Sequence, residues 1–141
     1  GGDVEAPIGR HPVDRKRMAV VPGGKEAITH YRVLERYRAH TLVRVRLETG
    51  RTHQIRVHMS YRHCPVVGDP VYGGRLRLPQ GASEALRLVL ANFRRQALHA
   101  TQLELVHPGS GERVSWAEDV PVDMARLIAV LREDASEQQE T

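Results

Sequence analysis

The sequence predicts a mixed α+β fold in which a few helices pack against a largely antiparallel sheet. Residues 42–48 alternate apolar and charged side chains, as a strand does when one of its faces is buried. Residues 26–37 alternate less regularly, and the short break at 38–40 predicts an antiparallel hairpin of the two segments. Residues 121–133 carry apolar side chains at helical spacing and predict an amphipathic helix.

The composition is that of a single globular domain. The chain has 141 residues, of which 40% are hydrophobic, so it can form a core and is too apolar to be disordered. Its one cysteine, Cys64, excludes an internal disulfide. No apolar run has the length of a membrane span, and residues 1–12 lack the apolar region of a signal peptide. We therefore expect a soluble, cytoplasmic protein that does not bind membranes.

Basic residues form clusters although the net charge is only +4. Acidic residues collect instead near the C-terminus, in residues 133–140. This distribution fits a face that binds a polyanion, and the alternative is that the arginines lie on solvated strand faces. Aromatic residues make up 4% of the chain, too few for a stacking platform that binds single-stranded RNA. The basic clusters are Arg10, Arg15, Lys16 and Arg17; Arg44, Arg46, Arg51, Arg56 and Arg62; and Arg94 and Arg95.

Further elements are expected on both sides of the hairpin. We expect an irregular opening segment at 1–16, a short strand at 17–22, and a helix at 52–62 with Thr52 as its N-cap. Residues 64–74 contain too much proline and glycine for regular structure. A second helix is predicted at 83–93 with Ser83 as its cap, then strands at 97–106 and 112–117 around a turn at 107–111. Residues 134–141 are expected to form a disordered acidic tail.

The segment that is most informative about function is LETGRTHQIRVHM, residues 47–59. It runs from an arginine-bearing strand through a glycine turn into a helix that carries Arg51, His53 and Arg56 near its start. Free N–H groups and the helix dipole attract anions to such a position. The segment therefore predicts a site for a phosphate or a buried carboxylate, and the alternative is a surface helix with ordinary charges.

The sequence predicts neither a metal site nor a cofactor. His53, His58, His63 and Cys64 lie close together in sequence, but His53 and His58 are five positions apart and do not share a helical face. Their spacing also matches no common zinc pattern. The chain contains no glycine pattern of a Walker or Rossmann nucleotide site.

Four segments resemble motifs of the RluA/RluC/RluD family of RNA pseudouridine synthases. LETGRTHQIRVHM resembles the family's third motif, and HCPVVGDPVYGG is similar to its H-P-hydrophobic-hydrophobic-G-D-x-x-Y-G loop. RRQALHATQLELVHPGSG resembles the R-Q-x-L-H-A strand and its His-Pro turn, and GKEAITHYRVLERY resembles the G-K-x-A-x-T-x-Y strand. The segments occur in the family's order across residues 17–117, and their residues are most similar to those of the RluD branch.

The resemblance implies the C-terminal half of a pseudouridine synthase catalytic core, an RNA-modifying isomerase that uses no cofactor. Its implied substrate is uridine in large-subunit ribosomal RNA, and we expect the protein to act as a monomer. Enzymes of this family depend on an ionised aspartate in an H-R-L-D-x-x-T-S-G motif, and this chain has no such motif. HPVDRKR places Asp14 near a histidine and arginines but lacks the rest of the pattern. The family's base-stacking tyrosine is also absent.

We therefore expect residues 1–141 to be one part of a catalytic domain and to be inactive alone. A truncation or a proteolytic product would explain the absent motif. The alternative is a non-catalytic RNA-binding module built on the same scaffold. A structural protein without RNA contacts is a third reading, which would require the arginine clusters to be scattered over several faces.

The resemblance also implies roles for individual residues. Arg56 matches the arginine that pairs with the catalytic aspartate, so we expect it to be catalytic and, within this chain, unpaired. Leu98 matches an apolar residue that contacts the uracil ring, although an ordinary core position is the alternative. Asp69 and Tyr72 are expected to shape their loop. Candidates for phosphate contact or for support of the pocket wall, with capping and packing as the alternative, are Arg51, Thr52, His53 and Gln54.

Overall fold

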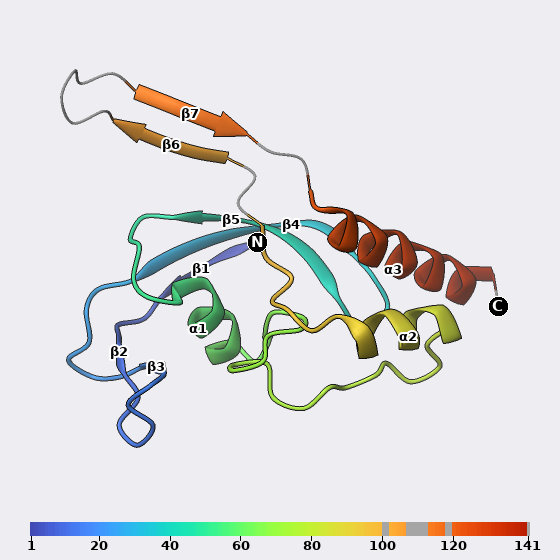
Figure 1. The fold of residues 1–141 in the computed structure, drawn as a ribbon, viewed down its shortest axis with the longest axis horizontal. Helices are drawn as coiled ribbons and strands as arrows, with labels where there is room; N and C mark the ends of the chain where they lie inside the picture. The colour runs from blue at the N-terminus through green and yellow to red at the C-terminus, as the bar shows by residue number, and fades with distance from the viewer. Residues whose placement is uncertain (100–101, 107–112, 118–119, 141) are drawn as a thin grey trace.

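The computed structural model describes residues 1–99, 102–106, 113–117 and 120–140, and these form the expected mixed α+β fold (Figure 1). In chain order the elements are β1 (Gly2–Glu5), β2 (Ile8–Arg10), β3 (Met18–Val20), β4 (Ile28–Arg36), β5 (Thr41–Leu47), α1 (Gln54–Tyr61), α2 (Glu84–Asn92), β6 (Gln102–Val106), β7 (Arg113–Ala117) and α3 (Val122–Glu140). The strands are antiparallel; α1 packs against the strands, whereas α2 and α3 pack against each other.

The central sheet has the strand order β1-β4-β5. The predicted hairpin is confirmed as β4 and β5, closed by a hydrogen bond of 2.9 Å from the Tyr37 N–H to the His40 carbonyl. Thr29 pairs with Leu47 on the face that α1 covers, whereas Arg32 pairs with Arg44 on the opposite face. The alternation of residues 42–48 therefore separates a packed face from an arginine-bearing one.

The prediction that residues 1–16 are irregular is wrong. β1 pairs with β4, and β2 pairs with β3 in a separate two-stranded sheet. Val4 and Ile8 are 1% and 2% exposed, so burial of these two side chains fixes both strands. Because β1 and β2 are short and separated by Pro7, neither shows a local alternation that predicts a strand.

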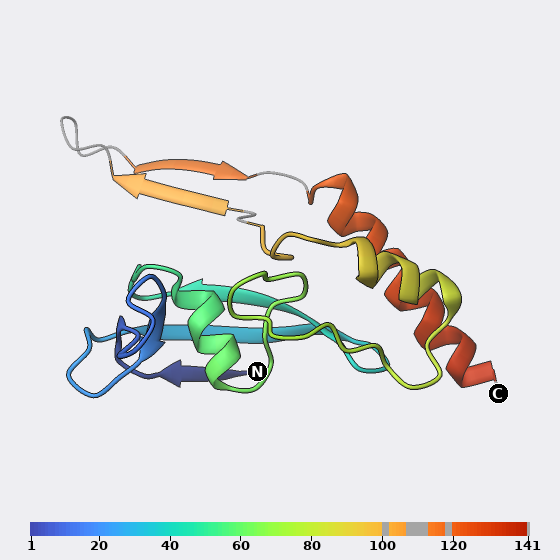
Figure 2. The ribbon, with the colours of Figure 1, turned by 60° about the horizontal axis from the view of Figure 1, so that its bottom comes forward.

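Two apolar clusters stabilise the described structure. The first lies between α1, the sheet and the β2–β3 hairpin, and contains Ile8, Ala27, Val57 and Tyr72. The second lies between α2 and α3, which run side by side in both ribbon views (Figures 1 and 2). Its buried members are Leu86, Leu90, Leu127 and Leu131.

The helix starts agree with the sequence in one case and differ in another. The Ser83 hydroxyl accepts the Leu86 N–H at 3.1 Å, which confirms the predicted cap of α2. Thr52 does not cap α1, which begins later than predicted. Its N-cap is His53, which has the left-handed backbone angles φ 55° and ψ 27° and makes no side-chain cap bond.

Residues 134–141 were expected to form a disordered tail, and this expectation is wrong from Asp134 to Glu140. α3 continues to Glu140, and the Asp134 side chain is only 1% exposed. Asp134 accepts the Arg38 Nε–H at 2.8 Å and the Ser83 backbone N–H at 2.6 Å. This carboxylate therefore joins α3 to the β4–β5 turn and to the start of α2.

The predicted strands near the C-terminus form β6 and β7, which pair in antiparallel register from Gln102 with Ala117 to Val106 with Arg113. β6 begins at Gln102, so Leu98 precedes the strand that was expected to carry it. The turn predicted at 107–111 lies outside the described residues. Among the described helices, none combines the length and apolar character needed to cross a membrane.

Candidate functional site

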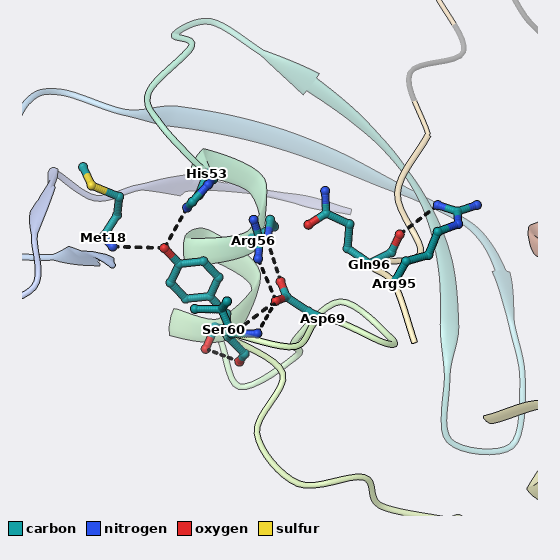
Figure 3. Close-up of polar contacts among 9 residues, drawn as sticks. Met18, His53, Arg56, Ser60, Asp69, Arg95 and Gln96 are labelled. Carbon is teal, nitrogen blue, oxygen red and sulfur yellow. Dashed lines mark hydrogen bonds and ion pairs between the residues drawn. The ribbon is translucent and has the colours of Figure 1, made fainter. Parts of the chain in front are cut away.

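Arg56 on α1 and Asp69 in the following loop form a two-point ion pair (Figure 3). Arg56 Nε lies 2.8 Å from Asp69 Oδ2, and Arg56 Nη2 lies 2.9 Å from Asp69 Oδ1. The two side chains are 12% and 0% exposed. The expectation of an unpaired Arg56 is therefore wrong, because Asp69 does more than shape its own loop. Two parallel N–H···O bonds fix the guanidinium plane as well as its charge.

Asp69 is itself held by the turn that follows it. Its Oδ1 accepts the backbone N–H groups of Val71 and Tyr72, both at 3.0 Å. An aspartate that bonds to N–H groups two and three residues ahead closes a tight turn and fixes its own side chain. The carboxylate therefore has a set position before Arg56 reaches it.

Both members of the pair are ionised at neutral pH. Burial raises the pKa of Asp69, but the hydrogen bonds from Arg56 and from the N–H groups of Tyr72 and Val71 outweigh it and bring this pKa down to about 2. The hydrogen bond to Asp69 raises the pKa of Arg56 above its ordinary value, against the effect of burial.

Arg56 keeps hydrogen-bonding capacity after pairing with Asp69. A guanidinium carries five N–H groups, and Asp69 accepts one from Nε and one from Nη2. Within the described part of the chain, Arg56 makes no other hydrogen bond. Its Nη1 group can therefore donate to a second anion. Because Asp69 fixes the guanidinium plane, it also fixes the direction in which Nη1 donates.

The Tyr72 side chain connects this pair to the β2–β3 hairpin. Arg56 Cζ lies 4.9 Å from the centroid of the Tyr72 ring, and Arg17 Cζ lies 5.1 Å from the same centroid. The Tyr72 hydroxyl accepts the Met18 N–H at 3.0 Å and lies 2.9 Å from His53 Nδ1. Since the hydroxyl accepts from Met18, its own proton is free to donate to His53. Tyr72 thus fixes both guanidinium groups relative to α1.

Gln54 has a packing role: its side chain is buried between α1 and the sheet. It is 3% exposed, and its amide NH₂ donates to the Ile28 carbonyl at 3.0 Å and to Thr29 Oγ1 at 2.9 Å. Its amide oxygen accepts the Thr49 hydroxyl at 2.7 Å and the Arg51 N–H at 3.0 Å. These four bonds use the full capacity of the amide, so Gln54 holds α1 on the sheet.

The other three candidates on this segment are closer to the surface. Arg51 Nε donates to the Glu26 carbonyl at 2.6 Å, which ties the guanidinium to the main chain. Thr52 and His53 are exposed, and His53 reaches the site through Tyr72. Of the four candidates, Thr52 and His53 therefore remain the most accessible to a substrate.

Leu98 lies beside the loop that carries Asp69. The Ala97 N–H donates to the Val67 carbonyl at 2.8 Å, two residues before Asp69. A side chain at Gly68, which has φ 76°, would place its Cβ 2.1 Å from the Arg95 carbonyl oxygen. Glycine is thus required where the two segments cross. The half-buried Leu98 follows directly.

The basic clusters separate in space. Arg44 and Arg46 lie on the sheet face turned away from α1, whereas Arg56 lies on α1 itself. Arg95 pairs with Asp123 at 2.7 Å near the start of α3. The N-terminal cluster approaches Arg56 through Arg17, which lies against the same Tyr72 ring.

Sequence reasoning underestimated Asp69 and Tyr72. The signal for Asp69 was the GDPVY segment, since an aspartate after glycine and before proline is typical of a side chain that caps its own turn. The contact with Arg56 crosses 13 positions of irregular chain, so no helical or strand period reports it.

Comparison with known proteins shows similarity to RNA pseudouridine synthases. Residues 2–61 match the model of the RNA pseudouridylate synthase family. The chain is 60% identical over 134 residues to the ribosomal large subunit pseudouridine synthase D of Pseudomonas aeruginosa and 59% identical over 137 residues to that of Escherichia coli. These matches cover 95% and 97% of this chain but 42% of each relative. The chain thus spans about two fifths of the length of these relatives.

Solved structures support the same fold. The human RNA pseudouridylate synthase domain containing 4 is 29% identical, with a TM-score of 0.67 over 93% of this chain and 56% of that chain. The human RNA pseudouridylate synthase domain containing 1 is 28% identical, with a TM-score of 0.66 over 91% of this chain and 51% of that chain.

Proposed function

As this chain is an RluD-like part of the RNA pseudouridine synthase family, we propose that the protein to which it belongs converts uridine to pseudouridine in large-subunit ribosomal RNA. The observation that carries the proposal is Arg56, a guanidinium that Asp69 holds in place and that keeps N–H groups for a second anion. That anion is the catalytic carboxylate, which a part of the protein outside residues 1–141 provides.

The reaction needs no oxidant and no group donor. The bond between uracil N1 and the ribose C1′ breaks, the base turns, and C5 forms a new bond to C1′. C5 loses its hydrogen as a proton and N1 gains one, so the net change is an isomerisation. An ionised aspartate drives it, either by attacking the sugar or by removing a sugar proton.

Arg56 keeps that aspartate ionised. A carboxylate packed under a flipped base loses hydration, which raises its pKa and favours the neutral form. An opposing guanidinium at about 4 Å contributes roughly 4 kcal/mol at an effective dielectric of about 20, before desolvation. Asp69 already neutralises part of the Arg56 charge. The direction of the Arg56 N–H groups, which Asp69 and Tyr72 set, therefore matters as much as the charge.

Residues near Arg56 contact the flipped base and the RNA backbone. Leu98 lies beside the Asp69 loop and supplies an apolar contact for the flipped base. Thr52 and His53, both exposed, contact the backbone of the RNA. We further expect the protein to work in the cytoplasm, as a monomer and without a cofactor.

A second candidate function is RNA binding without catalysis. The observation in its favour is that these 141 residues contain no H-R-L-D motif. In that case Arg56 and Asp69 serve only to fix the fold.

The test uses the full-length protein and ribosomal RNA labelled with tritium at uracil C5. Because C5 loses its hydrogen during the isomerisation, we expect time-dependent release of tritium by the full-length protein. Residues 1–141 alone are expected to release none. Binding of the RNA by the full-length protein without release would establish the second candidate instead.

A further inference from the structure

We propose that the β2–β3 hairpin is a docking surface for the RNA phosphodiester backbone next to the target uridine. Its cations are Arg10, Arg15, Lys16 and Arg17. The identity of the target rests on the proposed function, whereas the docking surface rests on the charge, order and position of the hairpin.

The charge of the hairpin is not compensated locally. Arg10, Arg15 and Lys16 are exposed, and Asp14 is the one acid between Arg10 and Arg17. The Asp14 carboxylate accepts the Lys16 backbone N–H at 3.2 Å, which closes the turn. Within the described residues, none of these four cations forms an ion pair. A compact group of unpaired cations attracts a polyanion and raises its rate of association.

The hairpin holds these cations in a defined shape. His11 Nδ1 accepts the N–H groups of Val13 at 3.1 Å and Asp14 at 3.0 Å. Arg10 Nη1 donates to the Arg15 carbonyl at 3.0 Å, and the Arg17 N–H donates to the Asp14 carbonyl at 3.1 Å. An ordered loop loses little conformational entropy when it binds a ligand, so the surface is organised before the RNA arrives.

Arg17 connects the hairpin to the reaction site. Its Cζ and that of Arg56 lie 5.1 and 4.9 Å from the Tyr72 ring centroid, so the two are at most about 10 Å apart. Both guanidinium groups are therefore close enough to act on one short segment of RNA. Arg17 Nε is buried and has no hydrogen-bond partner in the described part of the chain. Arg17 is thus an ordered cation close to Arg56, and it forms no ion pair within the described residues.

The chemistry of these residues favours a phosphodiester over an acidic protein. Guanidinium groups bind phosphate oxygens in pairs of hydrogen bonds, and the neighbouring Lys16 adds a point charge. The exposed members offer little apolar surface for a protein interface apart from Val13, which is 85% exposed.

The experiment compares RNA binding by the full-length protein with and without Arg15→Gln/Lys16→Gln. Neither side chain makes a hydrogen bond to the rest of the described structure, so we expect the double variant to fold normally. Its dissociation constant for the substrate RNA should rise roughly tenfold. The slope of log Kd against log salt concentration should fall by about 1.4 to 1.8, the value for two lost phosphate contacts.

The matched control is Arg87→Gln/Arg126→Gln, which removes the same charge from exposed positions on α2 and α3 at the other end of the fold (Figure 1). This control should bind RNA as the wild type does. Unchanged affinity and salt dependence in the hairpin variant would overturn the proposal, and so would equal losses in both variants. Tritium release by the wild type in the same RNA tests the proposed function separately.

Discussion

Arg56 is the residue to which we assign the chemistry, and its partner Asp69 sets the orientation of its guanidinium. A buried carboxylate occupies one edge of the guanidinium with two hydrogen bonds of 2.8 and 2.9 Å. Tyr72 lies against the same group at 4.9 Å. The N–H groups that Arg56 keeps therefore lie in a fixed plane, in which a second carboxylate can accept them. We infer that the proposed enzyme uses a bridge of two carboxylates through one arginine.

Replacing Asp69 with asparagine tests the first half of this bridge. The pKa of Asp69 is lowered from 3.8 to about 2, so the unfolded chain binds a proton more readily than the folded one. The pair therefore contributes about 2 kcal/mol to the free energy of unfolding above the ordinary pKa, and this is lost as the pH falls toward 2. Asp69→Asn should be less stable at pH 7 and should lose less stability between pH 5 and pH 2.5 than the wild type.

Urea unfolding at both pH values measures this difference. Asp14→Asn is the control, because it makes the same change at an exposed position of the β2–β3 turn. It should keep the acid dependence of the wild type. An Asp69→Asn protein with that same acid dependence would show that the carboxylate is not the depressed group.

At the scale of the element, α1 is held on the sheet by a buried chain of hydrogen bonds. Gln54 donates to Thr29 Oγ1 at 2.9 Å, and Thr29 Oγ1 lies 2.7 Å from His58 Nδ1. His58 Nε2 lies 2.9 Å from the Ala6 carbonyl, which only accepts, so Nε2 carries the proton. Nδ1 therefore accepts the Thr29 hydroxyl. This tautomer satisfies every member of the chain, and a second proton on His58 breaks it.

The stability of α1 should depend on pH through His58. Burial lowers the pKa of His58, the Ala6 carbonyl raises it in part, and Arg62 lowers it further. The unfolded chain then binds the proton more readily, so the free energy of unfolding should decrease as the pH falls below about 6.5. His58→Gln should reduce the difference in stability between pH 7.5 and pH 5.5, measured by urea unfolding.

His63→Gln supplies the control, because His63 is exposed just beyond the end of α1. It should leave the pH dependence of the wild type unchanged. If His58→Gln has the same slope as the wild type over this interval, the buried imidazole is not the titrating group.

The sequence predicts the start of a helix correctly where residues within that helix determine it. Ser83 caps α2 because its hydroxyl needs only the N–H of Leu86, three positions ahead. Thr52 is likewise a hydroxyl residue just before a predicted helix, but it does not cap α1. The amide oxygen of Gln54 accepts the Arg51 N–H at this end of α1, while its NH₂ group donates to Ile28 and Thr29 of β4. The start of α1 is therefore set partly by the sheet. A local pattern does not contain that information.

At the scale of the whole molecule, contacts between distant segments decided what sequence reasoning missed. β1 is a strand because β4 is beside it, and Asp134 is buried because Arg38, 96 positions earlier, donates to it at 2.8 Å. Both segments look polar and irregular when taken alone. The family motifs, by contrast, drew attention to Arg56, although they gave no sign that Asp69 would already hold it.

The two apolar clusters also divide the molecule by role. The cluster under α1 fixes Tyr72 and therefore the position of Arg56. The cluster between α2 and α3 lies apart from that site in both ribbon views (Figures 1 and 2). The segment 93–97 joins them, because Ala97 is bonded to Val67 at 2.8 Å beside the Asp69 loop. The candidate site is therefore located where the first cluster meets this connecting segment.

The most direct test of this account is the rate of tritium release from C5-labelled ribosomal RNA by the full-length protein carrying Arg56→Lys. Lysine keeps the charge that the buried Asp69 requires but not the planar fork, so we expect a near-normal fold and a rate lower by roughly a hundredfold. Arg56→Ala should be almost inactive and also destabilised by about 3 to 5 kcal/mol, because it leaves Asp69 buried and unpaired. Turnover close to that of the wild type in either variant would contradict the assignment of Arg56.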